Sequence, residues 1–229
     1  MRYLRSEFLK FLYNRWALII AVGTLIFIPV MAYTLGSFSG ETGKELIRSK
    51  ILQGLYLGQV GYVVTAGIYF GREYLGSALR TSLLASPVRL KVLAAKFTVI
   101  CLVSVFVFFL STLFSILATG CDEWLFEAVF PAFLSTMELV ILTSSAVLIS
   151  RSMTASMAVP VSLILGLGNL LLQYGKIFRY IPVISSMNCF FIRELPVYLQ
   201  TGRGLAVQGI WCLAIAAAGC LLFTRRAVR

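Results

Sequence analysis

Long apolar runs separated by short polar segments occupy most of the chain. Each run has about the 20 residues that a helix needs to cross the hydrocarbon core of a bilayer. Their length and hydropathy predict six membrane-spanning helices. The predicted spans are approximately residues 16–35, 51–70, 97–118, 128–149, 157–174 and 205–223. We therefore expect an all-α integral membrane protein in which residues 1–229 form one transmembrane domain.

Two further segments are predicted to lie at the membrane surface. In the N-terminal stretch MRYLRSEFLKFLYNRW, Leu4, Phe8 and Leu12 share one helical face, and basic residues lie largely opposite. This pattern predicts an amphipathic interfacial helix; the alternative is a basic flank that only sets the orientation of the chain. Residues 177–200 contain charges and prolines, which favours short helices or a re-entrant hairpin on the outer side over a seventh span.

The distribution of charge predicts the orientation and argues against a nucleic-acid partner. Hydrophobic residues make up 59% of the chain and charged residues 13%, against about 45–50% and about 25% in soluble domains. The net charge is +11, but thirteen of the 20 Lys and Arg residues fall on the side of the two termini. Since basic residues concentrate in cytoplasmic loops, we expect both termini in the cytoplasm and the basic excess next to lipid headgroups.

Few residues could support catalysis or metal binding. The chain has no histidine, and its five cysteines include no C-x-x-C pair, so no metal site is expected. Cys121 and Cys189 lie outside the apolar runs and could form a disulfide only if the fold brings them together. A P-loop is absent, because Gly43-Lys44 is followed by Glu45 and Gly175-Lys176 by Ile177, where the motif needs Ser or Thr. An intramembrane enzyme is an alternative class, but it would need a nucleophile with a base or a metal.

Glu138 is the one carboxylate inside a predicted span. A charge at the bilayer centre costs at least about 2.5–3.5 kcal/mol on insertion scales, so this side chain should face the bundle interior, a partner or a wet cavity. Two interpretations stay open. Glu138 could belong to a translocation path or gate, or it could be a hydrogen-bonded carboxyl that holds helices together, with Asn169 or Gln173 as partners.

The second predicted span is rich in glycine. Glycines spaced four residues apart let helix backbones approach closely, so these residues favour helix packing. The alternative is that this helix lines a central pathway, with the small and polar residues of the fifth span, including Asn169 and Gln173, opposite it. The glycines are Gly54, Gly58, Gly61, Gly67 and Gly71.

The apolar pattern is interrupted by the stretch FGREYLGSALRTSLLASPVRLKVLAAK, residues 70–96. Residues 73–84 have the periodicity of a short amphipathic helix. Ser86-Pro87 then provides an N-cap and a first-turn residue for the helix of the third span. A plain loop would need only a few residues, so we expect a structured connection on the side of the termini.

This connection resembles that of a known transporter family. The residues that carry the resemblance are Glu73-x-x-Gly76-Ser77, Leu83-Leu84, Pro87, Arg89 and Ala95-Lys96. They are similar to the segment between spans two and three of type-2 ABC exporter permeases. The six spans, the N-terminal helix with Glu7 and Lys10, and the basic tail extend the resemblance over the whole chain.

The resemblance implies a function and a set of partners. The connection would be a coupling helix that docks into a separate ATPase subunit, which binds ATP and Mg²⁺, so that no cofactor is held by this chain. A second permease copy or a related permease would complete the transporter in a bacterial cytoplasmic membrane. The small size is similar to exporters of amphipathic or antimicrobial peptides, such as lantibiotic-immunity, phenol-soluble-modulin and bacitracin-type permeases. The expected ATPase contacts are Arg72, Glu73, Gly76, Ser77, Arg80, Pro87 and Arg89.

The main alternative is a membrane protein that transports nothing. A scaffold or a stand-alone bacteriocin-immunity protein could have the same six spans. The long connection between spans two and three argues against it, because a scaffold has no evident need for such a segment.

Overall fold

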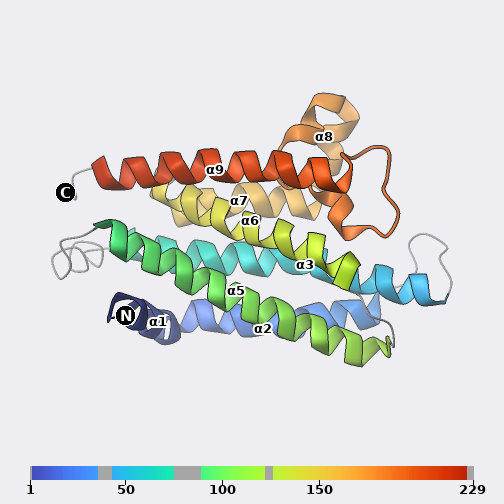
Figure 1. Cartoon of the computed structure of the whole chain (residues 1–229), viewed down its shortest axis with the longest axis horizontal. Helices are drawn as coiled ribbons and strands as arrows, with labels where there is room; N and C mark the ends of the chain where they lie inside the picture. Colours follow the sequence, from blue (N-terminus) through green and yellow to red (C-terminus); the bar gives the residue numbers. More distant parts are fainter. Residues whose placement is uncertain (1, 36–42, 75–88, 122–125, 226–229) are drawn as a thin grey trace.

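The computed structural model describes residues 2–35, 43–74, 89–121 and 126–225. In these ranges the chain forms helices and turns and no strand (Figure 1). The α-helices are α1 (Arg2–Tyr13), α2 (Arg15–Thr34), α3 (Lys44–Gly71), α5 (Arg89–Thr119), α6 (Phe126–Ser150), α7 (Met153–Ser162), α8 (Gly168–Tyr174) and α9 (Thr201–Arg225). The shorter helical turns are η1 (Arg72–Tyr74), η2 (Leu163–Leu167), η3 (Lys176–Tyr180) and η4 (Met187–Phe190).

The six predicted spans are confirmed. Among the described residues, six helices are long and apolar enough to cross a membrane. They are Arg15–Thr34, Lys44–Gly71, Leu90–Thr119, Phe126–Ser150, Met153–Tyr174 and Thr201–Arg225. The second and third are longer than the sequence pattern predicts. The apolar run ends at the first charged residues, but the helix does not have to end there. Long basic side chains can extend to the lipid headgroups from a helix that continues past the apolar run.

The fifth span is broken in the middle. It is assembled from α7, η2 and α8, and the break lies at Gly166, whose φ of 128° is open to glycine and strained for other residues. Figure 1 shows α8 directed away from the bundle axis that α7 follows. The sequence pattern predicts one continuous helix here, because the residues around Gly166 are apolar on both sides of it.

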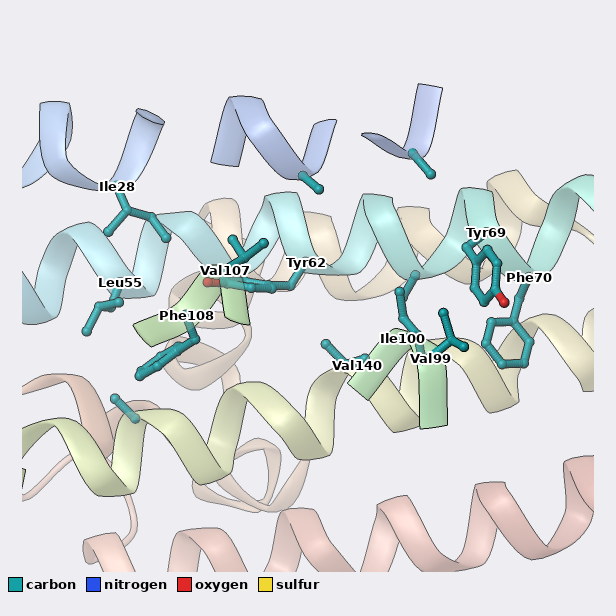
Figure 2. Packing of buried hydrophobic residues seen from close by; sticks show 14 of the residues in the cluster. Ile28, Leu55, Tyr62, Tyr69, Phe70, Val99, Ile100, Val107, Phe108 and Val140 are labelled. Carbon is teal, nitrogen blue, oxygen red and sulfur yellow. The ribbon is translucent and has the colours of Figure 1, made fainter. Parts of the chain in front are cut away.

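Helix α3 is the centre of the bundle. It packs against α2, α5, α6 and α7, and 61% of its most apolar window is buried, against 17% for α9. Tyr69 and Phe70 at its C-terminal end contact the α5 side of the core, where Val99 and Ile100 lie (Figure 2). Phe70 and Phe108 are among the largest fully buried side chains.

The glycines of α3 are the places where neighbouring helices come closest. A Cβ atom on Gly54 would lie 3.0 Å from the backbone oxygen of Ile28 in α2. A Cβ on Gly58 would overlap the side chain of Ile28, and one on Gly61 would overlap Thr24. Further along, Gly67 and Gly71 face Met157 and Met153 of α7 in the same way. Close helix packing is therefore the structural role of this glycine pattern.

Residues 175–200 form no seventh spanning helix. They consist of η3, η4 and turns, and the run from Val183 to Phe190 is buried against α3, α6 and α9. The segment then leads into α9, where Glu194 Oε1 accepts a hydrogen bond of 2.8 Å from the backbone N–H of Thr201. This bond holds the pKa of the Glu194 carboxyl below its usual range. Cys121 and Cys189 do not form a disulfide with one another.

We expect Gly204→Ala to lower the stability of the protein and Gly202→Ala to leave it unchanged or raise it slightly. A Cβ at Gly204 would overlap the backbone carbonyl of Ser185, and a backbone atom cannot turn aside as a side chain can. Overpacking of this kind costs roughly 1–3 kcal/mol. At Gly202, in the same turn of α9, nothing lies within 4 Å of the added atom.

Thermal unfolding of the purified variants in detergent measures the difference. A fall of several degrees is expected for Gly204→Ala alone. Equal midpoints for the two variants would show that α9 does not pack on Ser185 as the structure has it.

Candidate functional site

A chain of buried polar side chains crosses the bundle between three spans and the 175–200 segment. Gln59 of α3 donates from Nε2 to Ser135 Oγ of α6 at 3.5 Å, and Ser135 Oγ donates to Ser186 Oγ at 2.9 Å. Gln208 of α9 donates from Nε2 to the backbone oxygen of Ser135 at 2.8 Å. All four residues are at most 2% exposed. We call Gln59, Ser135, Ser186 and Gln208 the polar cluster.

Ser135 differs from the four hydroxyl residues that come next within α6. Thr136, Thr143, Ser144 and Ser145 each donate to the backbone oxygen four residues earlier in the same helix. Such bonds satisfy a hydroxyl locally and connect it to nothing else. Ser135 instead donates to another segment of the chain, and its backbone oxygen accepts a hydrogen bond from the side-chain amide of Gln208. It therefore links α6 to both α9 and the 175–200 segment.

Glu138 lies one helical turn after Ser135 and faces α9. A Cβ on Gly209 would be 3.2 Å from Glu138 Oε1, so the carboxylate lies directly over that glycine. Its other oxygen, Oε2, is buried and has no hydrogen-bond partner among the described residues. Gln208 Oε1 and Ser185 Oγ are buried without a partner as well. A buried unpaired polar group costs about 1–3 kcal/mol, so this region keeps unused acceptor capacity at the expense of stability.

The two amides predicted to face Glu138 lie elsewhere. Asn169 and Gln173 are both exposed on α8, beyond the break at Gly166. The side-chain oxygen of Asn169 accepts a hydrogen bond of 2.8 Å from the hydroxyl of Tyr198. The residues that do lie beside Glu138 come from α9, since Gly209 contacts it and Gln208 is its neighbour in the chain.

A second polar assembly lies at the C-terminal end of α3, where Tyr69 contacts α1. Tyr69 donates from its hydroxyl to the backbone oxygen and the Oε2 of Glu7, at 3.3 Å in each case. Glu7 is 2% exposed and forms an ion pair with Lys10. Phe11 meets the ring of Tyr69 edge to face at 5.5 Å between centroids. These contacts attach α1 to the last turns of α3.

The same assembly includes residues on both sides of the 75–88 segment. Before it, Arg72 of η1 donates from Nη1 to Asn14 Oδ1 at 2.7 Å, at the point where α1 ends and α2 begins. After it, Lys96 of α5 is 4% exposed, with Nζ 5.3 Å from the ring centroids of Tyr69 and Phe70, a cation–π arrangement. We call this assembly the α1–α3–α5 junction; it consists of Glu7, Phe11, Asn14, Tyr69, Arg72 and Lys96.

The predicted ATPase contacts are only partly covered by the structure. Arg72 lies in the junction, and the backbones of Glu73 and Arg89 belong to η1 and α5. Gly76, Ser77, Arg80 and Pro87 lie outside the described residues.

The polar cluster and the junction also contain residues that the sequence analysis did not single out. Gln208 is a strongly polar residue inside an apolar run, and that signal alone could have identified it. Ser135, Ser186 and Tyr69 carry no such signal, because serine and tyrosine are common in membrane spans. Their roles depend on which segments the fold brings together.

The fold and the polar groups within it define a multi-pass helical membrane protein with buried hydrogen bonds between its spans. A family model described as "ABC-2 family transporter protein" matches residues 3–169, well over half of the chain's 229 residues. The chain belongs to this family of ABC transporter permeases. No curated protein and no solved structure matches the chain. Members of the family are membrane subunits that are not themselves catalytic and generally work with a separate ATPase subunit.

We expect Glu138→Leu to keep or raise the thermal stability and to lower transport. Leucine removes a buried carboxyl oxygen that has no partner among the described residues, and an unsatisfied buried polar group costs stability. Glu138→Gln keeps the shape and the hydrogen-bonding capacity, so its transport should lie closer to that of the wild type. Unfolding midpoints in detergent and transport-coupled ATP hydrolysis provide the two measurements. A marked loss of stability in Glu138→Leu would assign the residue a structural role instead.

We expect Arg72→Gln to loosen α1. The Arg72–Asn14 hydrogen bond should contribute about 1 kcal/mol, because Arg72 is exposed to solvent and the bond is charge-assisted. Hydrogen exchange along α1 should then be about five-fold faster, the factor that corresponds to that free energy. Arg15→Gln is the matched control, since Arg15 is exposed at the start of α2. Equal hydrogen-exchange rates along α1 in both variants would show that the Arg72–Asn14 bond does not stabilise the position of α1.

Proposed function

We propose that the chain is the membrane subunit of an ATP-driven exporter that expels amphipathic or antimicrobial peptides. The observation that carries the proposal is membership of the ABC-2 transporter family over residues 3–169. Membership of the family supports the transport function. The small size of the chain and its resemblance to peptide exporters support amphipathic or antimicrobial peptides as the substrate. Energy would come from a separate ATPase subunit that binds ATP and Mg²⁺.

The ATPase is proposed to dock on the connection between α3 and α5. In favour of this site, η1 and the start of α5 flank the connection and belong to one buried junction that also holds α1. Within the junction, Glu7 and Lys96 are both almost fully buried, so their positions are fixed by packing as well as by charge. A displacement imposed on the connection would therefore reach three helices at once.

The orientation follows from the same proposal. An ATPase requires cytoplasmic ATP, so the junction and both termini would face the cytoplasm. Thirteen of the 20 basic residues lie on that side, in keeping with the preference of basic loops for the cytoplasm. Two permease copies, or this chain with a related permease, would face the two ATPase subunits.

The polar cluster and Glu138 are proposed to serve the export path. Most of these residues lie on membrane-spanning helices, and two of their oxygens, Glu138 Oε2 and Gln208 Oε1, have no partner among the described residues. A cationic amphipathic peptide carries ammonium and amide groups that could donate hydrogen bonds to these oxygens. When ATP hydrolysis drives the peptide out, these oxygens would lose their peptide partners and be available to the next peptide.

Peptide-stimulated ATP hydrolysis in proteoliposomes tests the proposal. The permease purified with its ATPase should hydrolyse ATP faster when a cationic amphipathic peptide is added, and the peptide should move across the membrane. Arg80→Glu should reduce this stimulation at least several-fold while leaving membrane insertion intact, because reversal of a charge at a partly desolvated contact weakens docking. Lys176→Glu is the matched control, since Lys176 is exposed on η3 in the segment predicted to lie outside.

The outcomes separate the parts of the proposal. If no ATPase co-purifies with the chain and no ATPase hydrolyses ATP faster in its presence, the transporter hypothesis is wrong. A non-transporting scaffold is then favoured. If hydrolysis is coupled to the permease but no peptide stimulates it, the exporter stands and the peptide class is wrong. If Arg80→Glu and Lys176→Glu behave alike, the ATPase docks elsewhere.

A further inference from the structure

An apolar groove lies at one end of the bundle between α1, α2 and α5. It encloses a cavity of about 410 Å³, within the usual size of small-molecule sites, and all eleven lining residues are apolar. Phe8 and Leu12 of α1 form one wall, Leu18 and Val22 of α2 a second, and Leu102 and Phe106 of α5 the third. Figure 1 shows α1 at the end of the bundle where α2 begins.

The groove is open on the face of helices that cross the membrane. Leu102 is 53% exposed and Phe106 is 65% exposed. Both belong to α5, and Val22 on the opposite wall belongs to α2, so two of the three walls are spanning helices. Hydrocarbon chains are the only apolar molecules that surround such helices in quantity. A lipid acyl chain therefore fits both the chemistry and the location of the groove.

A basic side chain lies at the edge of the groove. A second, smaller cavity of about 340 Å³ shares Phe8 and Leu102 with the first and is lined by Arg5 as well. Arg5 is exposed and makes no ion pair with the described part of the chain. Arg15, at the start of α2, is also exposed and basic. A headgroup bound to an acyl chain in the groove would lie beside Arg5, which favours a negatively charged headgroup.

We propose that the groove between α1, α2 and α5 binds an anionic phospholipid, with one acyl chain in the apolar cavity and the headgroup at Arg5. The bound lipid covers the exposed faces of Phe8 and Leu12 and joins α1 to the two spans behind it. Phe11 lines the groove and also contacts the ring of Tyr69, so the lipid and the junction hold α1 at adjoining places. Lipid composition would thereby influence how firmly α1 is attached.

Native mass spectrometry of the full-length chain, purified with any accompanying subunits, tests this site. The probes are phosphatidylglycerol and phosphatidylcholine with the same acyl chains, titrated separately. We expect the wild type to retain one phosphatidylglycerol per chain with about five-fold higher affinity than phosphatidylcholine, the factor for one basic residue near a lipid surface. Leu102→Trp and Val22→Trp, which fill the groove from opposite walls, should both lose the retained lipid.

Two matched controls identify the contacts. Leu113→Trp introduces the same side chain at a similarly exposed position three turns further along α5 and should keep the lipid. Arg5→Gln should bind the two lipids equally, and Arg225→Gln, an exposed arginine at the end of α9, should keep the preference. The Trp variants thus test the acyl-chain contact in the groove, and the Gln variants test the headgroup contact at Arg5.

Several results would overturn the proposal. A wild type that retains no lipid, or a Leu113→Trp variant that loses as much as Leu102→Trp, would exclude a lipid site in the groove. Equal affinity for the two lipids in the wild type would exclude the headgroup contact at Arg5. If the groove-filling variants dissociate an oligomer in the same spectra and lipid retention is unchanged, the groove is an interface with a second copy of the chain.

Discussion

In hydrocarbon, an apolar side chain gains little by exchanging lipid for protein, so spanning helices associate through close packing and a small number of polar contacts. In this chain both depend on α3. Its glycines bring α2 and α7 into contact with its backbone, and its polar residues Gln59, in the middle, and Tyr69, near the C-terminal end, bond to residues of other elements. The remaining helices are arranged around these contacts, and α9, which has less buried surface, is held by Gln208 and Gly204.

The fold was largely predictable from the sequence because the membrane imposes a length and a hydropathy on every span. All six spans are where the apolar runs place them. The break at Gly166 was not predicted, since a glycine among apolar residues is compatible with a continuous helix or a kink, and only packing decides between them.

The candidate site was less predictable than the spans. Periodicity indicates that Glu138 must avoid lipid, but it does not say which helix the carboxylate faces. Asn169 was a reasonable partner by residue type, and it is wrong because α8 turns away after Gly166 and Tyr198 occupies the amide. The bond between Ser135 and Ser186 joins residues 51 positions apart, a distance over which local pattern carries no information. By contrast, Glu7 and Lys10 are one turn apart on α1, and the sequence pattern pairs them correctly.

Four hydroxyl groups of α6 form hydrogen bonds within their own helix, and this affects how the helix can move. Thr136, Thr143, Ser144 and Ser145 complete their hydrogen bonds within their own helix. A shift of α6 against its neighbours leaves those four bonds intact, whereas the bonds of Ser135 join separate segments and must break or move. Ser150, at the C-terminal end of α6, bonds to Ser156 of α7 as well, so hydroxyl bonding resists a shift of α6 at two levels, around Ser135 and at the end of the helix.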